Sequence, residues 1–84
     1  MTNNSTFISH GNEIDHFMRQ VQIDEDPSYL CSAAFHLGDL YGRVYNHYSI
    51  GKLTKEEYDD LNNRIKALMH HIRKAAEAKE AEVE

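Results

Sequence analysis

The sequence predicts an all-α fold: a short N-terminal helix packed on a long antiparallel helical hairpin, three helices in all, assembled as a dimeric helical bundle. Three observations predict it. Apolar residues recur at three- and four-residue spacing in three stretches. Helix-start signals precede the second and third stretches. With 84 residues, the chain is one domain that buries roughly 60% of its unfolded surface, so we expect association to complete its core.

Composition narrows the range of functions. The 14 acidic and 9 basic residues give a net charge of −5, which opposes binding to nucleic-acid phosphates and to anionic membranes. No run approaches the ~20 apolar residues of a membrane span, and the polar start lacks the features of a signal peptide. The single cysteine, Cys31, is predicted to be a buried thiol, which fits a reducing compartment. We therefore expect a cytoplasmic protein.

The N-terminal part of the chain predicts a flexible arm over residues 1–11 and a short helix over about 12–22. In that helix, Ile14, Phe17, Met18 and Val21 follow the spacing of one amphipathic face. Such a short helix does not persist alone, so it must pack on its neighbours.

The second predicted helix spans residues 27–49 and is the centre of the expected fold. It follows an acidic loop, and Asp26 before Pro27 is a strong start signal. Two apolar seams run along it. The first consists of Leu30, Ala34, Leu37, Tyr41, Val44 and Tyr48, and the second of Cys31, Phe35, Gly38, Gly42 and Tyr45. Two seams predict contact with two neighbours.

Small residues also form a row on this helix, because Ala34, Gly38 and Gly42 lie four residues apart. Each glycine costs a helix about 1 kcal/mol relative to alanine. The row therefore predicts a close approach by another backbone or by a ligand.

The third predicted helix spans residues 54–76. Gly51 is expected to end the preceding helix in a left-handed conformation, and Thr54 with Glu57 forms a capping box. The core side of the helix consists of Tyr58, Leu61, Ile65, Leu68, Ile72 and Ala75. Residues 77–84 are expected to continue as a fraying, acidic helical tail.

The segment from Gly51 to Tyr58 resembles the turn and second-helix start of the short C-terminal (SHOCT) domain. In that family a glycine, an apolar residue and a T-x-E-E-aromatic run join two small helices. The resemblance covers about 20 residues, and Asn62, Asn63 and Arg64 depart from the lysine usually found downstream. It implies an oligomerising or docking accessory rather than an enzyme.

No motif predicts catalysis, a metal or a cofactor. The six histidines show no H-E-x-x-H spacing, and adjacent His70 and His71 point about 100° apart on a helix. Cys31 lies in a packing seam without an oxyanion element nearby. We therefore expect neither an enzyme nor a metalloprotein.

The tyrosines favour protein–protein interaction, because this side chain buries apolar area while its hydroxyl stays hydrated. We predict a non-catalytic adaptor, regulator or inhibitor, of the kind that phages and mobile elements encode, which contacts another protein and also a second copy of itself. The candidate contact residues are Ala34, Gly38, Tyr41, Gly42, Tyr45 and Tyr48.

Three other functions remain open. A basic stripe of Lys66, His70, Arg73 and Lys74 could contact nucleic acid, although the net charge opposes this. Alternatively, acidic residues including Asp24, Glu25, Asp26 and the tail could imitate phosphates and occupy a nucleic-acid-binding enzyme. The third is a helical bundle that binds a small ligand at the glycine row.

Overall fold

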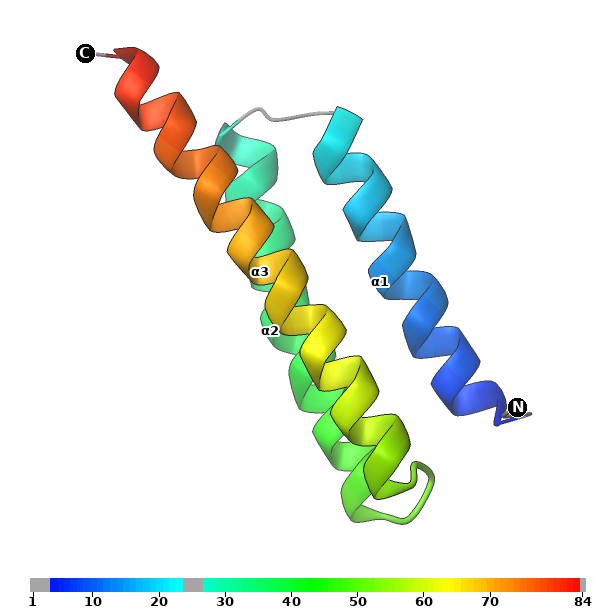
Figure 1. Ribbon diagram of the computed structural model, residues 1–84. Helices are drawn as coiled ribbons and strands as arrows, with labels where there is room; N and C mark the ends of the chain where they lie inside the picture. Colours follow the sequence, from blue (N-terminus) through cyan, green and yellow to red (C-terminus); the bar gives the residue numbers. More distant parts are fainter. Residues whose placement is uncertain (1–3, 24–26, 84) are drawn as a thin grey trace.

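Three α-helices make up the protein: α1 (Ser5–Ile23), α2 (Pro27–Ser49) and α3 (Lys55–Val83) (Figure 1). The computed structural model describes residues 4–23 and 27–83. Within these ranges there is no strand, so the prediction of an all-helical chain with three helices is confirmed. None of the described helices is both long and apolar enough to cross a membrane.

The helices run up, down and up, so that the start of α1 lies at the same end as the turn between α2 and α3 (Figure 1). At the other end, α3 extends beyond the start of α2. The residues from Glu77 to Val83, predicted as a fraying tail, continue α3 as one helix.

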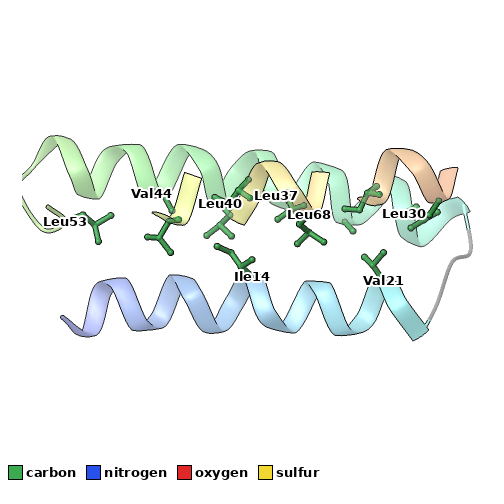
Figure 2. Packing of buried hydrophobic residues seen from close by; sticks show 13 residues of the cluster. Ile14, Val21, Leu30, Leu37, Leu40, Val44, Leu53 and Leu68 are labelled. Atoms are coloured by element: carbon green, nitrogen blue, oxygen red, sulfur yellow. The ribbon is translucent and has the colours of Figure 1, made fainter. Parts of the chain in front are cut away.

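The core lies along the line where the three helices meet, and α1 contributes Ile14 and Val21 to it from one side (Figure 2). On α2 and α3 the core residues alternate at three- and four-residue intervals, which keeps one face of each helix inward. These residues are Leu30, Ala33, Leu37, Leu40 and Val44 on α2, with Leu61, Ile65, Leu68, Ile72 and Ala75 on α3.

Helix α1 begins at Ser5, not at Asn12 as predicted, so most of the expected flexible arm is helical. The missed signal is Asn4, whose Oδ1 accepts a hydrogen bond from the Thr6 backbone N–H at 3.0 Å. This is a helix N-cap. The Asn4 amide also donates to the Lys52 carbonyl at 2.7 Å and to the Glu57 carboxylate at 3.1 Å. Asn4 therefore starts α1 and fastens it to the α2–α3 turn.

The turn between α2 and α3 has the predicted chemistry. Gly51 has a φ of 84°, and its N–H donates to the Tyr48 carbonyl, while the Lys52 N–H donates to the His47 carbonyl. This pair of bonds is a Schellman motif. The capping box is also present: the Glu57 N–H donates to Thr54 Oγ1 at 3.1 Å, and the Thr54 N–H donates to Glu57 Oε1 at 2.9 Å.

The two predicted seams of α2 differ in burial. Leu30, Leu37 and Val44 of the first seam are buried, whereas Cys31 and Phe35 of the second are exposed. The expectation of a buried Cys31 is therefore wrong. Ala33 and Leu40, which neither seam included, turn toward α1 and α3 and fill the core instead.

Candidate functional site

A groove of about 380 Å³ runs between α2 and α3. Its lining residues are Leu37, Gly38 and Tyr41 from α2, with Ile65, Lys66, Met69, His70 and Arg73 from α3. Leu37 and Ile65 belong to the core, whereas Tyr41 and Met69 are 42% and 39% exposed. The groove is therefore an open, apolar surface channel with cations along its α3 edge.

Helix α1 packs on the other side of the α2–α3 pair. Its side-chain hydrogen bonds and ring contacts include those to His36, Arg43 and His47 of α2 and to Arg64 of α3, and none of these residues lines the groove. At 100° per residue, these positions lie on the opposite flank of each helix from the lining residues. The α2–α3 pair thus has a covered side and an open side.

The glycines of α2 lie on the open side, and nothing in the described part of the chain packs on them. A Cβ added at Gly38 or Gly42 would meet no atom within 4 Å. The close approach that the sequence predicted at these glycines is instead found at Gly11 of α1, where a Cβ would lie 3.0 Å from the Arg64 guanidinium. The helix-propensity cost of Gly38 and Gly42 is therefore not offset by packing within the described chain.

Large apolar side chains also project from α2 near these glycines. Phe35 is 80% exposed and Tyr45 is 56% exposed. Phe35, Gly38, Gly42 and Tyr45 are spaced by three or four residues, so they form a continuous stripe along the helix. We refer to these four residues as the outer stripe.

Only part of the basic stripe predicted on α3 lies along the groove. Lys66, His70 and Arg73 line the groove, whereas Lys74 does not and lies 3.9 Å from Glu77. The groove therefore brings together two predicted sets, because Gly38 and Tyr41 of the tyrosine–glycine set lie across from three members of the basic set.

The other predicted contact residues lie elsewhere. Ala34 and Tyr48 are partly buried and pack against the core, and the ring of Tyr48 stacks on Tyr58 with centroids 4.4 Å apart. The acidic candidates Asp24, Glu25 and Asp26 lie outside the described residues.

The covered side contains a histidine pair that sequence reasoning missed. His10 Nε2 and His47 Nδ1 lie 2.7 Å apart and share one proton in a hydrogen bond. His10 is only 4% exposed, and its Nδ1 has no hydrogen-bond partner among the described residues. Burial and the neighbouring charges of His47 and Arg43 lower the pKa of His10, while Glu13 opposes this shift.

A polar hollow of about 390 Å³ adjoins this pair, and its lining includes Arg43 and Glu13, which form an ion pair at 2.7 Å. Across the described residues, no three His, Cys, Asp or Glu side chains are placed to hold a metal ion. A signal for the pair does exist in the sequence. The spacing of Ile14 and Val21 extends back through His10 and Phe7, and the core spacing of α2 extends forward from Val44 to His47.

Comparison with family models, with curated proteins and with solved structures found no match.

Proposed function

We propose that this chain is a small, non-catalytic interaction protein that binds another protein through the open side of its α2–α3 pair. Such a protein would act as an adaptor, or as a regulator or inhibitor of the kind that phages and mobile elements encode. We place it in a cytoplasm, where its exposed Cys31 would stay reduced.

The observation that carries the proposal is the outer stripe beside the groove. A phenylalanine that is 80% exposed lies in the same stripe as two glycines that no described residue covers. Apolar groups and aromatic rings exposed together are typical of interaction surfaces. Glycines allow a partner helix to approach the backbone closely, which offsets their cost within α2.

Site-specific photo-crosslinking in the cells that express the protein tests this proposal. A photoreactive residue at position 35 should crosslink to a discrete protein, because this position would lie in the interface. The same residue at position 63, an exposed site of α3 away from the groove, is the control. Crosslinking to nothing from position 35, or equally to the same proteins from both positions, would refute the proposal.

A second copy of the chain is the other candidate occupant, as expected for a dimeric bundle. The exposed Phe35 favours it, since a symmetric pair of outer stripes would cover both rings. Sedimentation velocity across a range of concentrations tests this directly. A dimer that dissociates in a Phe35→Ser variant would support self-association, and a monomer at all concentrations would exclude it.

A small-ligand site is less well supported. The groove volume falls within the range of ligand pockets, but such pockets bury most of the ligand surface. Tyr41 and Met69 are too exposed to enclose a small molecule in this way. The acidic-mimic function depends on Asp24, Glu25 and Asp26, which lie outside the described residues, and no observation on the described ones favours it.

A further inference from the structure

Three basic side chains line one edge of the groove at a helical spacing. Lys66, His70 and Arg73 are exposed and lie four and three residues apart on α3. Lys66 and Arg73 are separated by about 10.5 Å along the helix at 1.5 Å per residue. None of the described residues that line the groove is acidic, so the charge along its edge is of one sign.

These basic side chains differ from those on the covered side because none of them has an ion-pair partner among the described residues. Arg43 pairs with Glu13 at 2.7 Å, and Arg64 pairs with Asp15 at 3.0 Å, so both are neutralised by α1. None of the ion pairs between described residues includes Lys66, His70 or Arg73. The groove thus combines an apolar floor with an edge whose charge is uncompensated within the described chain.

We propose that the occupant of the groove is an acidic amphipathic α-helix of a different protein. This inference rests on the proposed function and specifies the chemistry of the partner. The apolar face of such a helix would cover Leu37, Tyr41 and Met69. Carboxylates two helical turns apart on its flank would pair with Lys66 and Arg73, and Gly38 would allow the helix to lie close to α2.

The same charges disfavour a second copy as the occupant of the groove. In a symmetric pair each copy presents the same patch, so the groove edges would bring Lys66 and Arg73 of both copies to one interface. The described lining residues include no carboxylate that would balance them. Like charges placed opposite each other at an interface act against that pairing.

Nucleic acid would also meet the cations but would not use the rest of the groove. Apart from Tyr41, its floor is formed by aliphatic and thioether side chains, and the chain carries a net charge of −5. Binding to phosphates grows with the number of neutralised charges, and the described residues of this edge offer two permanent ones, Lys66 and Arg73. An acidic helix satisfies both the apolar floor and the cationic edge.

Selection from a library of displayed helical peptides tests the inference while the natural partner is still unidentified. The library randomises apolar, acidic, basic and neutral residues over an amphipathic helix, and the full chain is the bait. We expect the selected peptides to be enriched in Asp and Glu on one flank of an apolar face. The double variant Lys66→Glu/Arg73→Glu should bind them about tenfold or more weakly and should select basic peptides instead.

Arg19→Glu is the matched control, because Arg19 is an exposed cation of α1 without an ion pair among the described residues. It should bind the acidic peptides as the wild type does, and circular dichroism should show both variants folded. Selection of peptides without acidic enrichment, equal loss in the Arg19 variant, or no selected peptide at all would overturn the inference.

Two further measurements address the other occupants. Fluorescence anisotropy with a labelled single-stranded oligonucleotide should show no binding that depends on Lys66 and Arg73. Sedimentation of the isolated chain should likewise show no self-association that the Lys66→Glu/Arg73→Glu change abolishes. If either did, that occupant would replace the acidic helix. A crosslinked partner from position 35 with no acidic preference in the library would leave the proposed function standing and remove only this inference.

Discussion

The two sides of the α2–α3 pair are built from the same two helices but differ in whether α1 supplies partners for their side chains. On the covered side, α1 supplies partners for the polar groups: Glu13 for Arg43, Asp15 for Arg64 and His10 for His47. On the open side, Lys66 and Arg73 have no ion pair with any described residue, and Phe35 is 80% exposed. This difference is the basis of the proposal that a partner binds the open side.

The largest expected effect is the difference in stability loss between a buried and an exposed position of α2. Leu40 is fully buried and touches the core, so Leu40→Ala should lower the free energy of unfolding by about 2–5 kcal/mol. Phe35→Ala, on the open side, should change it by less than about 0.5 kcal/mol. Urea unfolding of both variants measures this, and a similar loss for both would mean that Phe35 is buried in the protein in solution.

Removal of the link between α1 and the turn should have the next largest effect. Asn4→Ala removes the N-cap of α1 and its bonds to Lys52 and Glu57, so we expect a loss of about 1–2 kcal/mol. In the Asn4→Ala variant, amide hydrogen exchange should accelerate relative to the wild type in the first turns of α1, and by more than in α3. Unchanged exchange there would show that another contact holds this end of α1.

Glycine-to-alanine substitutions should change stability differently on the two sides of the α2–α3 pair. Gly38→Ala should stabilise the isolated protein by up to about 1 kcal/mol, because alanine favours the helix and its Cβ meets no described atom. Gly11→Ala should gain less, since its Cβ would lie 3.0 Å from Arg64 and displace the guanidinium that donates to the Gly11 carbonyl. Thermal unfolding compares them, and a loss of stability in Gly38→Ala would reveal a close neighbour at that site.

Lowering the pH should reduce the stability of the protein through His10, which lies on the covered side. The pKa of His10 is lowered by burial from its ordinary value of 6.5, so the unfolded chain takes up a proton at a higher pH than the folded chain does. The contribution of His10 to stability is therefore complete above 6.5 and declines as the pH falls through 6.5 toward its lowered pKa.

A His10→Leu variant isolates this effect from the other histidines. The wild type should lose more stability than the variant between about pH 7.5 and about pH 5, as followed by urea unfolding. Parallel losses in the two proteins would show that His10 does not control the response.

The sequence predicted the helix boundaries whose signals lie in neighbouring residues. Pro27 marks the start of α2, Gly51 marks its end, and the Thr54–Glu57 box marks the start of α3. Each signal lies beside the boundary that it marks, so these boundaries were predictable. The start of α1 was missed because Asn4 stands in a polar stretch, and most of its partners lie 48 and 53 residues away. Position in a seam was a poor guide to burial, since α1 covers only one flank of α2.

The site was predictable in part for the same reason. Gly38, Tyr41 and the cations of α3 were identified separately from spacing, but their meeting in one groove depends on how α2 and α3 are rotated against each other. The His10–His47 pair was missed because it requires the extended α1. Pairing across helices is a tertiary property that local spacing does not determine.

The most direct measurement of the central claim, that the open side binds a partner, is the crosslinking yield from position 35 in two variant backgrounds. Gly38→Leu places a bulky side chain in the groove at a position where its Cβ meets no described atom within 4 Å, whereas Asn46→Leu adds the same side chain at an exposed position outside the groove. We predict that Gly38→Leu abolishes the crosslink while the protein stays folded, and that Asn46→Leu retains it. Equal crosslinking in both variants would contradict the claim.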